Sequence, residues 1–199
     1  MKKIVIASQN QGKIQEFQAM LSPLGYIVLT PKDLDIHEDI EETGTSFLEN
    51  AILKAQALRK STDLDIIADD SGLEVMALHG NPGVHSKRYS KESTAEANNQ
   101  LLLNELEGIS DRRARFVATI VYLDRMNHIH HFEGVVDGTI LCEPKGCQGF
   151  GYDPIFEVEE FGKSMAELSM DMKNQVSHRA RALHKLIHFL KESNENPHL

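Results

Sequence analysis

The 199-residue sequence contains only two cysteines and no tryptophan. Cys142 and Cys147 are too few for the disulfide framework of a small secreted protein or for a cysteine-ligated structural zinc site. This scarcity favours a reducing compartment. The longest strongly apolar stretch, residues 116–123, is far shorter than the ~20 residues that a membrane-spanning helix needs. We therefore expect a cytoplasmic protein without a membrane partner.

Basic residues are also scarce. The sequence has 21 Lys and Arg against 30 Asp and Glu, and its formal net charge is −9. The field of such a chain repels a nucleic-acid backbone, so we expect no nucleic-acid partner. Hydrophobic residues make up 41% of the chain, which is ordinary for a globular protein. The composition predicts a single domain over residues 1–199, with a disordered tail at 194–199.

Hydrophobic periodicity predicts alternating strands and helices. Residues 4–7 are typical of a strand, and apolar residues then recur at helical spacing from Ile14 to Leu24. A Ser-x-x-Glu pattern at Ser46 predicts the start of another helix. Further strands are predicted at 26–30, 64–68, 116–123 and 129–136, and further helices after Ser93 and Ser177. Because no repeat or linker interrupts this pattern, it favours one mixed α/β unit.

The first predicted strand leads into a polar loop, residues 8–13, which ends in Lys13. A strand that feeds the N-terminus of a helix exposes backbone N–H groups, and these can hold a phosphate when a lysine is near. The segment is not a P-loop, because Ala7 and Ile14 stand where that motif needs glycine and serine or threonine. Alone, the pattern is compatible with an anion site and with a plain turn.

Two adjacent carboxylates, Asp69 and Asp70, follow the apolar strand 64–68. Successive strand residues point to opposite faces, so only one of the two is expected in a given site. A carboxylate there suits Mg²⁺, but Asp and Ser before Gly72 also favour an ordinary turn. The acidic residues Glu38, Asp39, Glu41 and Glu42 are more typical of a solvated face than of a metal site.

Two further segments are unusual. Phe150 and Tyr152 are separated by Gly151 in a glycine-rich loop, and an aromatic ring on such a loop can stack on a planar base. His178 and Arg179 stand in the first turn of the last predicted helix, where a cation opposes the helix dipole. That placement indicates an acceptor for them to meet, although a surface helix can also tolerate two such residues.

Six short motifs follow one another in a fixed order along the chain. They are Ser8-x-Asn10-x-x-Lys13, Glu41-Glu42-Thr43-Gly44, Glu49-Asn50-Ala51, Ala68-Asp69-Asp70-Ser71-Gly72, Phe150-Gly151-Tyr152-Asp153-Pro154 and Ser177-His178-Arg179. Together they resemble the inosine triphosphate pyrophosphatase family over essentially the whole chain. The resemblance implies an elongated mixed α/β fold, with a long central twisted mixed sheet flanked by helices. It also implies two lobes with the active-site cleft between them, and a homodimer.

The resemblance further implies a Mg²⁺-dependent hydrolase. Its substrates are the non-standard purine nucleoside triphosphates ITP, dITP, XTP and dXTP, which it converts to the monophosphate and pyrophosphate, cleansing the nucleotide pool. By the same resemblance Asp70 is the general base, and Glu41 and Asp70 bind Mg²⁺. Two alternatives stay open: a Maf-like pyrophosphatase acting on other modified nucleotides, and a non-catalytic nucleotide-binding regulator.

The implied substrate-binding residues fall into two groups. The triphosphate group comprises Ser8, Gln9, Asn10, Gln11, Gly12, Lys13, Lys54 and Ser71. The base group comprises Phe150, which stacks on the base, and Gly151, Tyr152, Asp153, Lys173, His178 and Arg179, which surround its edge.

Overall fold

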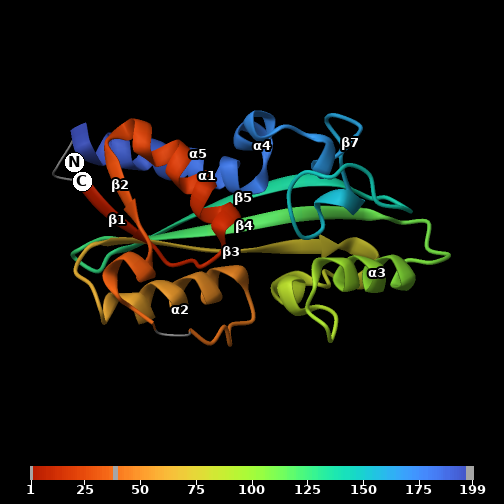
Figure 1. Cartoon of the computed structure of the whole chain (residues 1–199), viewed down its shortest axis with the longest axis horizontal. Coiled ribbons are helices and arrows are strands. Elements are labelled where there is room, and N and C mark those ends of the chain that lie inside the picture. Colours follow the sequence, from red (N-terminus) through yellow and green to blue (C-terminus); the bar gives the residue numbers. More distant parts are fainter. Residues whose placement is uncertain (1, 38–39, 196–199) are drawn as a thin grey trace. The chain divides into compact units, whose positions relative to one another are not determined.

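The computed structural model describes residues 2–37 and 40–195 (Figure 1). Within these residues, seven strands form one open sheet in the order β2-β1-β3-β4-β5-β6-β7. The strands are β1 (Lys2–Ile6), β2 (Tyr26–Leu29), β3 (Asp65–Val75), β4 (Arg113–Leu123), β5 (Ile129–Ile140), β6 (Phe156–Val158) and β7 (Lys163–Ser164). The helices are α1 (Gln11–Leu21), α2 (Phe47–Arg59), α3 (Ala95–Glu105), α4 (Met170–Val176) and α5 (His178–Glu195). Because β1 pairs parallel with β2 and β3 while β6 pairs antiparallel with β5 and β7, the predicted mixed sheet is confirmed.

The chain forms two compact units. Unit 1 comprises Met1–Asp70, Ala118–Gly134 and Arg179–Leu199, and unit 2 comprises Ser71–Val117 and Val135–His178. The residues implied to bind the triphosphate therefore belong to unit 1, apart from Ser71. Those implied to bind the base belong to unit 2, apart from Arg179.

The core of unit 1 has two layers, because side chains alternate along its strands. Ile4 and Ile67 pack in one cluster with α1 and α5, whereas Val5 and Ala68 pack in another with α2. Figure 1 shows α1 and α5 on one side of these strands and α2 on the other. The same alternation carries residue 69 to the α1/α5 face and residue 70 to the α2 face.

β3 continues without a break from Asp65 to Val75, so the segment Asp69 to Gly72 lies inside a strand. The interpretation of this segment as a turn is therefore wrong, as is its placement at a strand end. Leu73 and Val75, beyond the polar segment, are fully buried in the core of unit 2. Apolar side chains are buried both before and after the polar segment in the sequence. Their burial favours one long strand and outweighs the local turn preference of Asp, Ser and Gly.

The core of unit 2 gathers side chains from α3 and four strands. Leu102 of α3, Leu73 of β3 and the rings of Phe116 and Phe156 belong to one buried cluster, in which the two ring centroids lie 4.5 Å apart. Helix α3 begins after Thr94, whose Oγ1 accepts the Ala97 N–H at 3.2 Å, one residue later than predicted. The short elements α4, β6 and β7 were not predicted, because they are too brief to show a period.

Parts of two predicted segments lie outside the described residues. Asn194 and Glu195 are the last residues of α5, and the rest of the predicted tail, 196–199, is not described. Glu38 and Asp39 of the acidic segment lie outside as well. Among the residues that the structure does describe, no helix combines the length and the hydropathy that crossing a membrane requires.

Candidate active site

The loop between β1 and α1 is closed largely by its own hydrogen bonds. Asn10 caps α1, and its Oδ1 accepts the backbone N–H groups of Gly12 at 2.9 Å and Lys13 at 3.3 Å. Ser8 Oγ accepts the Asn10 N–H at 3.2 Å. Asn10 therefore engages two of the backbone N–H groups that could hold a phosphate, those of Gly12 and Lys13. The Lys13 side chain is the cation that the loop supplies.

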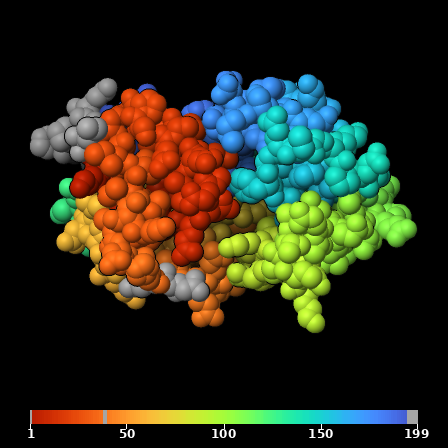
Figure 2. Space-filling view, in the orientation of Figure 1, coloured from red at the N-terminus to blue at the C-terminus, as the bar shows by residue number. Residues whose placement is uncertain are grey.

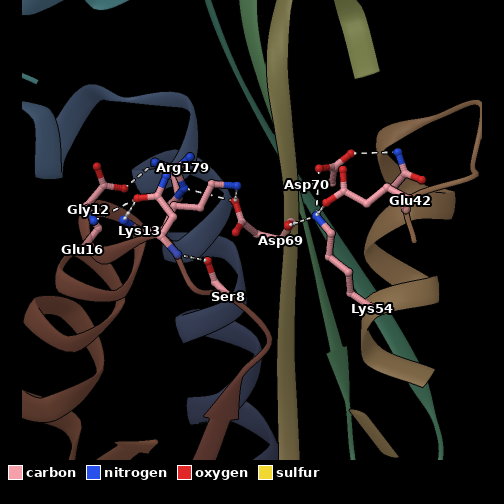
Figure 3. Close-up of polar contacts among 11 residues, drawn as sticks. Ser8, Gly12, Lys13, Glu16, Glu42, Lys54, Asp69, Asp70 and Arg179 are labelled. Atoms are coloured by element: carbon pink, nitrogen blue, oxygen red, sulfur yellow. Dashed lines mark hydrogen bonds and ion pairs between the residues drawn. The ribbon is translucent and has the colours of Figure 1, made fainter. Parts of the chain in front are cut away.

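On the α1/α5 face of β3, Asp69 holds two cations (Figure 3). Asp69 Oδ2 lies 3.0 Å from Lys13 Nζ and 3.2 Å from Arg179 Nε. Arg179 Nη1 in turn lies 2.6 Å from Glu16 Oε2 on α1. Asp69 is 1% exposed and Arg179 is 3% exposed. These four residues, which we call the Asp69 cluster, thus bring two positive and two negative charges together from β3, α1 and α5.

Asp69 is held in its charged form. Burial acts to raise its pKa, but the charges of Lys13 and Arg179 outweigh burial and hold the pKa well below its usual range. Burial lowers the pKa of Lys13, and the Asp69 charge opposes that shift. Because Asp69 Oδ2 is buried between Lys13 and Arg179, which favour its charged form, Asp69 is a poor proton acceptor.

The Asp69→Asn substitution should destabilise the fold strongly. It keeps the shape of the side chain but leaves the buried Lys13 and Arg179 charges with too little compensation, which costs about 3–5 kcal/mol when one partner of a buried pair is removed. Urea unfolding monitored by circular dichroism measures this loss. Asp111→Asn is the matched control, because Asp111 pairs with Arg113 at an exposed site and its loss should barely move the midpoint. Equal midpoints for all three proteins would contradict the prediction.

On the α2 face of the same strand, Asp70 meets a different group (Figure 3). Asp70 Oδ1 lies 2.9 Å from Lys54 Nζ, and Asp70 Oδ2 accepts from Asn50 Nδ2 at 3.2 Å. Lys54 Nζ also lies 2.8 Å from Glu42 Oε1 and donates to the Asp69 carbonyl oxygen at 3.0 Å. Burial raises the pKa of Asp70 above its usual value, although Lys54 opposes the shift. Two neighbouring aspartates thus differ in their affinity for a proton.

The start of α2 positions the residues around Asp70. Ser46 caps the helix as predicted, and its Oγ accepts the Glu49 N–H at 3.2 Å. Gly44 N–H donates to Asn50 Oδ1 at 2.8 Å, which orients the other end of that amide toward Asp70. A Cβ atom on Gly44 would lie only 2.7 Å from Asn50 Oδ1, so a larger residue would displace the amide.

Asp70 and Glu42 form a donor set that suits Mg²⁺. One oxygen of each lies within 3 Å of the same Lys54 nitrogen, so the two carboxylates converge on one point. Mg²⁺ usually takes one or two carboxylates and completes its octahedron with water and substrate phosphate. Over residues 2–37 and 40–195, no three His, Cys, Asp or Glu side chains gather into a metal site. The implied ligand Glu41 has an exposed side chain, whereas its neighbour Glu42 faces Lys54.

In unit 2, the glycine-rich loop holds its aromatic side chain outward. Asp153 Oδ2 accepts the Phe150 N–H at 3.2 Å and Lys173 Nζ at 2.8 Å. Gly149 has a φ of +93°, and a Cβ atom there would lie 2.0 Å from Asp153 Oδ2 and 2.3 Å from Lys173 Nζ. Phe150 is 45% exposed, while Asp153 and Lys173 are buried. The loop therefore presents one exposed ring on a backbone fixed by a buried ion pair.

Two of the residues implied to surround the base make contacts in the core of unit 2. The ring of Tyr152 is buried in the unit 2 core, and its hydroxyl donates to the Ser86 carbonyl oxygen at 2.9 Å. His178 is buried and stacks on Phe116, with centroids 4.8 Å apart and planes 12° apart. Tyr152 thus anchors the loop, because its ring gains more from burial than from exposure beside Phe150.

The remaining residues that the resemblance implies to bind the substrate differ in their exposure and contacts. Gln9 and Gln11 are exposed, and Ser71 and Gly151 are half-buried. Arg179 was expected at the base edge, but its guanidinium lies in the Asp69 cluster with Lys13. The sequence alone indicated no role for Glu16 or Asn50. It favoured a solvated position for Glu42, and that prediction is wrong, because Glu42 Oε1 lies 2.8 Å from Lys54 Nζ. Glu16 stands three residues after Lys13 on one helix face, and that spacing is the signal that could have indicated it.

Comparison with known proteins supplies independent evidence. A model of the Ham1 family matches residues 4–189. A protein of Bacillus licheniformis named dITP/XTP pyrophosphatase is 48% identical over 189 residues, which cover 94% of this chain and 96% of that one. A Staphylococcus aureus protein of the same name is 48% identical over 191 residues, covering 96% and 97%.

Solved structures give the same result for the fold. The structure of the Staphylococcus aureus Ham1 protein has a TM-score of 0.89 and 46% identity, and the match covers 96% of this chain and all of that one. A HAM1 protein from Coxiella burnetii also has a TM-score of 0.89, at 42% identity and the same coverage. The family resemblance and the fold class predicted from the sequence are therefore confirmed.

Proposed function

The chain belongs to the Ham1 family, and on this premise we propose that it hydrolyses non-standard purine nucleoside triphosphates, among them dITP and XTP. The products are the nucleoside monophosphate and pyrophosphate, and the reaction removes such nucleotides before they enter DNA or RNA. The relatives that carry the name dITP/XTP pyrophosphatase are 47–48% identical to nearly the whole chain. The structural observation that carries the proposal is the convergence of Asp70 and Glu42 on the Lys54 nitrogen.

Asp70 is the proposed general base. Cleavage of the bond between the α- and β-phosphates needs a water molecule that is oriented and deprotonated as it attacks phosphorus. Asp70 has the raised proton affinity that such a base needs, whereas Asp69 is kept ionised by two cations. Asn50 and Lys54 fix the two oxygens of Asp70 by hydrogen bonds. When a substrate phosphate draws Lys54 away, the bond from Asn50 still orients the carboxylate.

Several cations can neutralise the triphosphate. Lys13 and Lys54 have flexible side chains whose ammonium groups can exchange a carboxylate for a phosphate oxygen. Glu42 and Asp70 would hold Mg²⁺, which when bound supplies positive charge to the phosphates. Charge neutralisation in a site that excludes water is usually the largest contribution to catalysis of this kind.

Phe150 and Lys173 support recognition of the base. An exposed ring on a fixed loop offers a stacking surface to any purine. Lysine and arginine are donors without acceptors, so a side chain such as Lys173 can satisfy the 6-oxo group of hypoxanthine or xanthine. The 6-amino group of adenine is itself a donor and cannot accept a hydrogen bond from that lysine.

A panel of nucleoside triphosphates tests the proposal. Released pyrophosphate is measured with Mg²⁺ for dITP, ITP, XTP, GTP, ATP and modified pyrimidine nucleotides. We expect kcat/KM to be highest for dITP, ITP and XTP. A preference for modified pyrimidines would instead indicate a Maf-like activity, and tight binding without turnover would indicate a regulator.

We further propose that the protein acts as a homodimer in the cytoplasm, on the strength of the family resemblance. Light scattering coupled to size-exclusion chromatography measures the mass in solution, and a monomer at micromolar concentration would contradict the dimer.

A further inference from the structure

The Phe150 loop is held from a second side by the first half of α3. Asn99 Nδ2 on that helix donates to the carbonyl oxygen of Gly151 at 3.1 Å. The neighbouring Asn98 Nδ2 donates to the carbonyl oxygens of Ser86 and Lys87, at 3.3 Å and 3.2 Å. Two consecutive asparagines therefore hold the glycine loop and the segment around Ser86. Figure 2 shows the corresponding surfaces of unit 2, cyan and yellow-green, against one another.

The Ser86 segment is itself a second anchor for the loop. Its carbonyl oxygen accepts the Tyr152 hydroxyl at 2.9 Å, and its Oγ accepts the Leu73 N–H from β3 at 2.9 Å. Asn98 Oδ1 also accepts the Ser90 N–H at 2.7 Å. The loop residues Gly151 and Tyr152, which directly follow Phe150, are thus tied to α3 and to β3 by hydrogen bonds.

The surroundings of Asn99 favour a role for its amide group in the hydrogen bond to the Gly151 carbonyl oxygen. Asn99 is 9% exposed, and its Oδ1 is buried with no hydrogen-bond partner among the described residues. A buried acceptor without a partner destabilises a protein, and an apolar residue at this position would avoid that cost. The bond from Nδ2 to the Gly151 carbonyl is the contact that only an amide or a similar donor can make here.

Fixing the backbone at Gly151 matters because glycine is the most flexible residue in an unfolded or mobile loop. Gly149 and Gly151 both have positive φ, at +93° and +63°, and Phe150 between them is 45% exposed. Among the described residues, the Phe150 ring belongs to none of the buried core clusters and is not one of the partly buried side chains packed against them. Its orientation therefore depends on the anchors of its neighbours.

We propose that Asn99 is a positioning residue for base recognition: by holding the Gly151 carbonyl, it fixes the Phe150 ring in the orientation that stacks on a purine. The inference rests on the proposed function of Phe150 but assigns a role to a residue outside that site. Without Asn99, the loop must become ordered when the nucleotide binds. Ordering the backbone of one residue weakens binding by roughly 5- to 30-fold.

Steady-state kinetics of Asn99→Ala give the first test. We expect KM for dITP to rise by roughly 5- to 30-fold while kcat changes less than about twofold. The inhibition constant of inorganic tripolyphosphate, which has no base, should stay at the wild-type value. Gln100→Ala is the matched control, because Gln100 lies next on α3 and bonds only to the exposed Asn104 in the described structure. Phe150→Ala sets the largest KM increase that loss of the ring can produce.

Tryptophan fluorescence gives a second test that needs no substrate. The sequence has no tryptophan, so Phe150→Trp introduces a unique reporter into the loop. Adding Asn99→Ala to this protein should increase the fast component of the anisotropy decay, whereas adding Gln100→Ala should leave it unchanged. This readout reports on the loop even if the protein hydrolyses none of the nucleotides tested, so failure of the inference is separable from failure of the proposed function.

Three outcomes would overturn the inference. The first is an unchanged anisotropy decay in the Asn99→Ala background. The second is a parallel rise in KM for dITP and in the inhibition constant of tripolyphosphate, which would indicate a disturbed triphosphate site. The third is a lower kcat at unchanged KM, which would indicate only a loss of folded protein.

Discussion

Replacement of Asp70 by asparagine should lower kcat for dITP by at least ~100-fold, the lower end of the effect expected when a general base is lost. Asparagine keeps the size of the side chain and can still bond to Asn50, but it accepts no proton and carries no charge for Lys54 or a metal ion. KM should change much less than kcat, because the side chain acts on the water and not on the base. Initial rates of pyrophosphate release measure both parameters.

Asp65→Asn is the matched control for this substitution. Asp65 is the first residue of the same strand, and its carboxylate faces Arg125 at 3.6 Å, away from the group around Asp70. Its activity should stay within a factor of two of the wild type. Equal turnover by wild type and Asp70→Asn, with both proteins folded by circular dichroism, would remove Asp70 from the mechanism.

Removal of divalent cations should abolish activity. Without a metal ion, a triphosphate with about four negative charges must approach the carboxylates of Glu42 and Asp70 at close range, and their repulsion is strong where water is excluded. We expect no pyrophosphate release in excess EDTA and full recovery when Mg²⁺ is restored. Full activity in EDTA would contradict the proposal.

Two glutamate variants can show which residue binds Mg²⁺ together with Asp70. Glu42→Gln should raise the Mg²⁺ concentration that gives half-maximal activity, because Glu42 converges with Asp70 on one point. Glu41→Gln is its neighbour in sequence, has an exposed side chain in the structure and should leave that concentration unchanged. The opposite result would support the ligand implied by the family resemblance.

The sequence predicted the opposite orientations of Asp69 and Asp70 through a local rule. A period of two places Asp69 and Asp70 on opposite faces, and the structure confirms this, with Lys13 and Lys54 on the two sides. The cap of α2 at Ser46 was predicted by a similarly local pattern. Such features depend on residues a few positions apart, so a single sequence is enough to predict them.

The contacts of Arg179 and Tyr152 could not be predicted in this way. Arg179 meets Asp69 across 110 positions of sequence, and no local pattern specifies which of several carboxylates a distant cation will contact. Tyr152 and Phe150 stand two residues apart with similar rings, yet one is buried and the other exposed. The residues that bond to this part of the loop, Asn99 and Ser86, lie more than 50 positions away in the sequence.

The fit of Gly149 against a buried ion pair has a consequence for evolution. Because a Cβ atom there would collide with both Asp153 and Lys173, the three positions cannot vary independently. A lineage that loses the glycine must also give up the ion pair or rebuild the loop, whereas the φ of +93° favours glycine even where the pair is lost. Loss of Gly149 should therefore be accompanied by substitution at 153 or 173 among descendants of this sequence, while loss of the ion pair need not be accompanied by loss of the glycine.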